Sequence, residues 1–185
     1  LESGKAWDLN RKRDGLFILP PYVTRSSTGS YSGLLDAIRS NLNYVRRASQ
    51  RYALISGSST VFNMKFDDMM AQHLATGADI TILYNVPADD ESNGDADRTH
   101  LKMDESGRVV DIEVTPHLNT YPNVSMDVYI MDKALLTYLV EVSAAHYRSD
   151  FVRDVLIKQL GELKIYGYKY DGYVSRIDSI ASYYK

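Results

Sequence analysis

Residues 52–64 decide the fold class, and they read Tyr52-Ala53-Leu54-Ile55-Ser56-Gly57-Ser58-Ser59-Thr60-Val61-Phe62-Asn63-Met64. A short apolar run is followed by a turn of small residues and then by a second apolar cluster. A run of this kind, closed by turn formers, is typical of a buried strand in an α/β sheet. Ligands of open α/β sheets bind beyond the carboxyl ends of the strands, so we expect chemistry at residues 56–60. That turn offers only hydroxyl and backbone groups.

The composition is typical of one globular domain. The chain has 185 residues, enough to bury a sizeable core. Its formal net charge of -3 gives no support for a nucleic acid or an anionic membrane as a partner. It has no cysteine, which excludes disulfides and thiolate metal sites and fits a reducing, cytoplasmic compartment. No apolar run approaches the roughly 20 residues that span a bilayer.

Strand and helix patterns alternate along the rest of the chain. Apolar residues at helical spacing predict amphipathic helices at residues 34–48 and 67–76. Apolar runs predict strands at residues 15–19, 80–86, 124–131 and 164–170, and a hairpin at residues 99–114. Asp132 and Asp150 are each expected to cap a helix that begins directly after them. The alternation favours an α/β fold with a mostly parallel sheet, helices on both faces and one antiparallel hairpin.

Motifs for common chemistries are absent from the sequence. The four histidines lack the spacing of a zinc site, and no nucleophile elbow, dinucleotide-binding loop or P-loop occurs. Gly33 stands just before a predicted helix, whose N-terminus suits a phosphate or the edge of a base. Tyr166, Tyr168 and Tyr170 share one face of a strand and could line a sugar site, although a half-buried sheet face is the more common explanation. The residues alone predict an α/β domain with a vacant active-site turn.

A series of short motifs runs in order over almost the whole chain. They are Gly4-Lys5-Ala6-Trp7-Asp8-Leu9, Arg13-Asp14-Gly15, Leu19-Pro20-Pro21, Gly33-Leu34-Leu35-Asp36-Ala37-Ile38, Leu54-Ile55-Ser56-Gly57, Ser125-Met126-Asp127-Val128-Tyr129-Ile130, Asp150-Phe151, and Gly172-Tyr173 leading to Ser182-Tyr183-Tyr184. The series resembles bacterial ADP-glucose pyrophosphorylases (glucose-1-phosphate adenylyltransferases), and most closely their GlgD class of regulatory subunits. The resemblance implies a Rossmann-like nucleotidyltransferase sheet that is incomplete here. Residues 1–185 would form one partial domain, without the family's N-terminal Gly-rich loop and C-terminal β-helix domain.

The resemblance implies an attack of glucose 1-phosphate on the α-phosphorus of ATP, with magnesium held by carboxylates. The positions that carry this chemistry in catalytic members are replaced here. Two aspartates correspond to Ser59 and Arg176, and the lysine for the sugar phosphate corresponds to Thr115. The chain is therefore expected to keep no catalytic residue and no metal site. Losing one preorganised charge-stabilising group typically lowers the rate by about 10²–10³.

Other family positions suggest where ligands would lie. Gly33 and Asp36 occupy a motif of the family's nucleotide site, so the resemblance makes them candidate contacts for a nucleotide. Ser125 and Asp127 stand at substrate positions, with Asp127 in place of the family's glycine. The charged side chain of Asp127 would point to where the sugar approaches.

Three functional hypotheses follow. The first is a non-catalytic regulatory subunit in glycogen biosynthesis that pairs with a catalytic homologue in a hetero-oligomer. The second is an active adenylyltransferase making ADP-glucose, with the missing groups supplied by the family's N-terminal segment; a short shift of the alignment would also put the carboxylate of Asp178 in place of Arg176. The third is an effector module in which Arg176 and the basic residues 11–13 hold a sugar phosphate or nucleotide. An intramolecular ion pair is the simpler explanation of Arg176.

Overall fold

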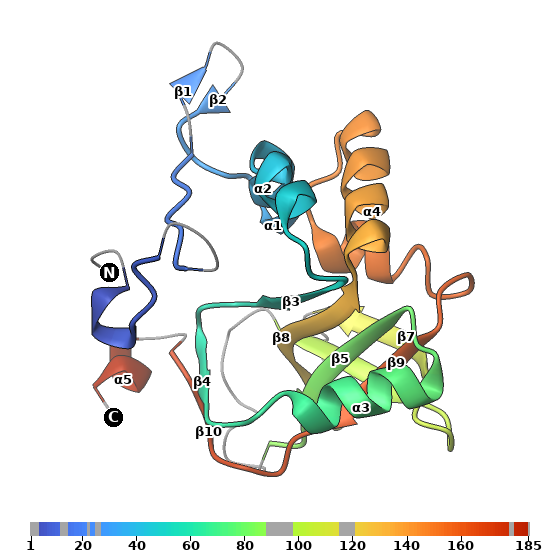
Figure 1. Ribbon diagram of the computed structural model, residues 1–185. Coiled ribbons are helices and arrows are strands. Elements are labelled where there is room, and N and C mark those ends of the chain that lie inside the picture. The colour runs from blue at the N-terminus through green and yellow to red at the C-terminus, as the bar shows by residue number, and fades with distance from the viewer. Residues whose placement is uncertain are drawn as a thin grey trace.

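A computed structural model describes residues 4–11, 15–21, 23–24, 27–87, 98–114, 121–177 and 180–184. A six-stranded sheet forms its centre, with helices packed on both faces (Figure 1). The strands of this sheet are β3 (Tyr52–Ser56), β5 (Ile80–Asn85), β6 (Thr99–Met103), β7 (Val109–Val114), β8 (Asn123–Asp132) and β9 (Ile165–Lys169). Two smaller ladders join β1 (Val23–Thr24) to β2 (Ser27–Thr28), and β4 (Thr60–Phe62) to β10 (Val174–Arg176).

The helices follow the order of the chain. They are η1 (Lys5–Trp7), α1 (Leu34–Ser40), α2 (Leu42–Arg47), α3 (Asp67–Thr76), α4 (Lys133–Ala145), the π-helical η3 (Val152–Leu156) and α5 (Ile180–Tyr183). Asp132 and Asp150 cap helices as predicted, because their carboxylates accept hydrogen bonds from the backbone N–H groups of Ala134 and Arg153, at 2.8 and 2.9 Å. No helix among the described residues has the length and apolarity needed to cross a membrane.

β8 is the central strand of the sheet. β5 pairs with it on one side, while β3 and β6 pair with different parts of its other side, and all three are antiparallel to it. β9 is parallel to β5, and β7 closes the predicted hairpin with β6. Consequently β3, β5, β6 and β9 run in one direction, and β7 and β8 run in the other.

The α/β class, the hairpin and the helices on both faces are confirmed. Most strands share one direction, as expected, but hydrogen-bonded neighbours are mostly antiparallel rather than parallel. The direction of β8 accounts for the difference. It runs opposite to β3, β5 and β6, so all three of its pairings are antiparallel, and the hairpin adds a fourth antiparallel pairing.

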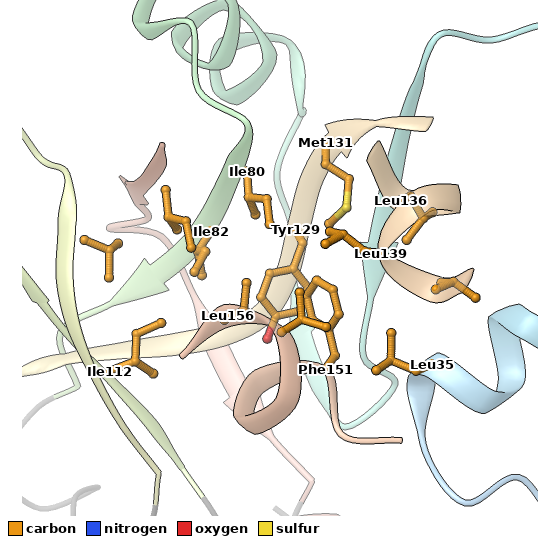
Figure 2. Packing of buried hydrophobic residues seen from close by; sticks show 14 of the residues in the cluster. Leu35, Ile80, Ile82, Ile112, Tyr129, Met131, Leu136, Leu139, Phe151 and Leu156 are labelled. Atoms are coloured by element: carbon orange, nitrogen blue, oxygen red, sulfur yellow. The ribbon is translucent and has the colours of Figure 1, made fainter. Parts of the chain in front are cut away.

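The core lies on both faces of the sheet because side chains alternate along β8. Tyr129 and Met131 join one cluster, which α1, α4 and η3 cover. In that cluster the rings of Tyr129 and Phe151 meet nearly edge to face, with centroids 5.0 Å apart (Figure 2). Val128 and Ile130 join a second cluster under α3. Each fully buried side chain of this size stabilises the fold by about 1.5–3 kcal/mol.

Three sequence predictions of local structure are wrong, and the first is the buried strand at residues 52–56, because β3 is partly exposed and Leu54 is 44% exposed. The helix predicted at residues 34–48 is broken at Asn41, whose side-chain Nδ2 donates to the carbonyl of Ala37 and to the hydroxyl of Tyr31, each at 2.9 Å. An asparagine that bonds to the backbone competes with the helical pattern, which the apolar periodicity does not reveal. The strand predicted at residues 15–19 is irregular, and no ladder pairs with it among the described residues.

Candidate functional site at the end of β3

The turn after β3 links the main sheet to the β4–β10 ladder. The backbone N–H of Gly57 donates to the carbonyl of Asp127 at 2.9 Å, which holds the turn against β8. In the ladder Arg176 lies opposite Thr60, and the N–H of Ile177 donates to the carbonyl of Ser59 at 2.8 Å. Ser59 and Arg176 are far apart in sequence, and the structure brings them to neighbouring positions at one end of this ladder.

A bulge in β8 shapes the opposite wall of the turn. Leu83 pairs with Val128, but the next residue of β5, Tyr84, pairs with Ser125, so the register shifts across residues 126–127. Asp127 adopts a left-handed backbone conformation with φ of 56°. Aspartate tolerates this region better than most residues do, and glycine tolerates it best. The bulge therefore explains why a glycine suits this position in the family motif and why aspartate is an acceptable replacement.

Ser59, Ser125, Asp127 and Arg176 together are called the strand-end site below. The guanidinium of Arg176 donates to the carbonyl oxygen of Ser125, and the hydroxyl of Ser125 accepts from the N–H of Asp127 at 3.1 Å. The hydroxyl of Tyr129 donates to Oδ1 of Asp127 at 3.3 Å. Arg176 thus ties β10 to the bulge of β8.

The carboxyl group of Asp127 is under two opposing influences. Burial raises its pKa, whereas the positive charge of Arg176 and the hydrogen bond from Tyr129 act to lower it. The pKa of Asp127 remains raised overall. Burial also raises the pKa of the Tyr129 phenol, so this hydroxyl stays protonated and acts as a donor. A buried carboxylate is costly unless it is paired or hydrogen-bonded, and the hydrogen bond from Tyr129 together with the positive charge of Arg176 offsets part of this cost.

The strand-end site does not fit a magnesium ion. Magnesium takes oxygen ligands and usually needs one or two carboxylates that are free to coordinate it. This site offers the single carboxylate of Asp127, which already faces the charge of Arg176. Across the part of the chain that the structure describes, no group of three or more His, Asp or Glu side chains is placed to hold a metal ion.

Gly33 and Asp36 lie elsewhere, at the start of α1 and beside α4, well separated from β4 and β10 in Figure 1. A Cβ atom on Gly33 would lie 2.4 Å from the carbonyl oxygen of Ser149, so close packing requires glycine there. Oδ2 of Asp36 accepts from the N–H and the hydroxyl of Ser32, at 3.1 Å each, and its Oδ1 pairs with Arg39 at 2.9 Å. These bonds lower the pKa of Asp36. Both residues have structural roles, and nucleotide contact by them remains a prediction.

Several predicted positions fall outside the described residues: Thr115, Asp178 and residues 12–13. Arg11 is described, and it forms an exposed ion pair with Asp8 at 2.5 Å. Tyr168 and Tyr170 pack against the second core cluster, and the hydroxyl of Tyr170 donates to the carbonyl of Asn63 at 2.8 Å. The half-buried sheet face therefore accounts for these two tyrosines.

The sequence analysis missed the electrostatic link between Asp127 and Arg176. One signal could have revealed it. The resemblance implies that both residues depart from the family pattern with changes of opposite sign, because it places Asp127 at a glycine position and Arg176 at an aspartate position.

Comparison with known proteins identifies the family. Residues 9–173 match the family described as Nucleotidyl transferase. The glucose-1-phosphate adenylyltransferase of Halalkalibacterium halodurans is 31% identical over 98% of this chain and 48% of its own length. Those of Bacillus cytotoxicus and Bacillus mycoides are 32% and 33% identical, each over 97% of this chain and 48% of their own length. This chain therefore spans about half the length of the curated relatives it matches. Because the family match covers most of the sequence, the chain belongs to the nucleotidyl transferase family.

Proposed function

We propose that this chain is part of a regulatory subunit of the GlgD class, without catalytic activity of its own. In this proposal it works with a catalytic glucose-1-phosphate adenylyltransferase in cytoplasmic glycogen biosynthesis. The names of the relatives support the enzyme family. One observation carries the regulatory role: Ser59 and Arg176, which the resemblance aligns with two metal-binding aspartates, occupy neighbouring backbone positions at one end of the β4–β10 ladder.

Charge explains why this observation argues against catalysis. Adenylyl transfer builds negative charge on phosphate oxygens, and bound metal ions balance that charge. At the strand-end site one expected carboxylate is a hydroxyl group and the other is a guanidinium. A cation at this position opposes metal binding, and the guanidinium of Arg176 already donates to the protein itself. Losses at groups that act as a unit do not multiply, but one such loss typically costs about 10²–10³ in rate.

An active adenylyltransferase that makes ADP-glucose from ATP and glucose 1-phosphate is the second candidate. It is favoured by the relatives, which carry that name at 31–33% identity over nearly the whole chain. The altered strand-end site favours the regulatory role over this candidate. A sugar phosphate or nucleotide effector at Arg176 stays an expectation, since the known contacts of Arg176 are internal.

The test is ADP-glucose formation by the full-length protein with magnesium, ATP and glucose 1-phosphate. The protein is assayed alone and then mixed with a catalytic homologue, and the homologue alone provides the reference rate. The regulatory proposal expects no turnover alone and a changed rate or effector response in the mixture. A matched control mixes the homologue with an unrelated protein at equal concentration. Turnover at ordinary rates by the full-length protein alone would overturn the proposal in favour of the enzyme.

A further inference from the structure

The two unusual charges of the strand-end site come from two strands, β8 and β10, that are joined at Ser125. The carboxyl of Asp127 is at the bulge of β8, and the charge of Arg176 acts on it from β10. Ser125 connects the two residues, because its carbonyl accepts from Arg176 while its hydroxyl accepts from the N–H of Asp127. Neither charge is placed as an isolated surface group.

Each charge also lowers the energetic cost of placing the other at the strand-end site. A partly buried carboxylate without a counter-charge would be destabilising, and so would a guanidinium directed at a strand end without an acceptor. The charge of Arg176 reduces the first penalty, although the pKa of Asp127 remains raised, and the carbonyl of Ser125 removes the second. It also supplies a fixed positive charge inside the protein, where a metal ion would otherwise be the source of positive charge.

We propose that Asp127 and Arg176 form one coupled unit, in which the guanidinium is the resident cation of the strand-end site and makes the site indifferent to divalent metal. This inference deepens the proposed function and rests on it only for the comparison with catalytic members. The coupling itself concerns residues of this chain and can be measured without any assay of turnover.

Coupling predicts that the two positions cannot be changed independently. Arg176→Asp would replace the positive charge of the strand-end site with a second carboxylate, so the two like charges would repel one another and would attract a divalent cation. Asp127→Gly in the same protein would remove one of them and suit the left-handed backbone at position 127. We therefore expect the double variant to be more stable than the Arg176→Asp single variant.

The first arm of the experiment measures stability in the full-length protein. Melting temperatures are recorded for the native protein, Asp127→Gly, Arg176→Asp and the double variant. The expected result is a melting temperature for Arg176→Asp several degrees below that of the native protein, of which the second change restores at least half. Strictly additive changes would overturn the coupling. If Arg176→Asp does not fold, Arg176→Gln with and without Asp127→Asn completes the same cycle with neutral side chains.

The second arm measures metal binding with Mn²⁺, by the loss of the free-ion electron paramagnetic resonance signal. Arg176→Asp is expected to bind Mn²⁺ at least tenfold more tightly than the native protein does. Arg176→Lys is the matched control: it keeps the positive charge and should bind Mn²⁺ no better than the native protein. Equal binding by the native protein and Arg176→Asp would overturn the claim that Arg176 excludes metal. Turnover by the native protein alone would instead refute the regulatory role, so the two failures are distinguishable.

Discussion

Replacing Gly33 with alanine tests whether this residue serves packing or ligand binding. The Cβ of alanine would lie 2.4 Å from the carbonyl oxygen of Ser149 and 3.1 Å from its carbonyl carbon. Gly33 has an extended backbone, with φ of 168°, so alanine adds no backbone strain and the whole cost is steric. The new atom falls about 1 Å short of ordinary contact with an oxygen of the main chain, which cannot rotate away. Overpacking of this kind typically costs about 1–3 kcal/mol.

The cost converts into a measurable shift of melting temperature. For a chain of this length about 1 kcal/mol lowers the melting temperature by about 2–4 °C, so we expect Gly33→Ala to lower it by about 2–12 °C. Circular dichroism during heating or in urea provides the assay. Gly161→Ala is the matched control, because a Cβ there meets nothing within 4 Å, and it should leave the melting temperature nearly unchanged. Equal stability of the two variants would refute the packing argument. Unchanged stability together with lost ATP binding would support a nucleotide contact at Gly33 instead.

Two further predictions concern residues away from the site. Asp132 caps α4 and pairs with Arg51, and these contacts lower its pKa, chiefly through the hydrogen bond from the N–H of Ala134. Asp132→Ala should therefore cost about 1 kcal/mol of unfolding free energy in urea, and Asp132→Asn should cost less because asparagine is also a good cap. The stabilisation by the Asp132 carboxylate is present above about pH 4 and is lost as the pH falls through its lowered pKa. If the native protein were still more stable than Asp132→Ala by the same amount at pH 2, the ionised carboxylate would not be the source of the stabilisation. For His73, burial lowers the pKa, while the charges of Asp79 and Asp132 act to raise it. The unfolded chain therefore binds a proton at His73 more tightly than the folded protein does, and the unfolding free energy should fall as the pH drops below about 6.5. Urea unfolding at pH 8 and pH 5 measures this fall, which should be smaller for His73→Gln than for the native protein.

Elements with strong periodicity were predictable from the sequence. α3 begins and ends where the pattern placed it, β5 and the β6–β7 hairpin match within a residue or two, and Asp132 caps α4. The break at Asn41 was not predictable, because the apolar spacing continues through it while the side chain of Asn41 bonds to the backbone. The position of β8 also required the structure. Apolar runs identify a strand but do not say which neighbours it pairs with, and in the described part of the chain β8 pairs with three strands.

The candidate site was predictable only in part. The motif series pointed to Ser59 and Arg176, and the structure places them together through the β4–β10 ladder. Each of those strands has three residues, too few to show a period, so the sequence alone gave no reason for the pairing. The left-handed conformation of Asp127 was equally hidden, since it arises from the register shift against β5.

The strand-end site can change its chemistry without a change of fold, because its residues lie where the core ends. Met126 and Val128 flank Asp127 and pack in the cluster beneath α3, so the alternation of side chains places Asp127 on the other face of β8. Ser59 and Arg176 lie at the end of a short ladder outside the main sheet. Substitutions at these positions alter charges and hydrogen bonds but remove little buried apolar area, which is the main source of stability. A nucleotidyl transferase fold can therefore change the charges of this site while it keeps its core.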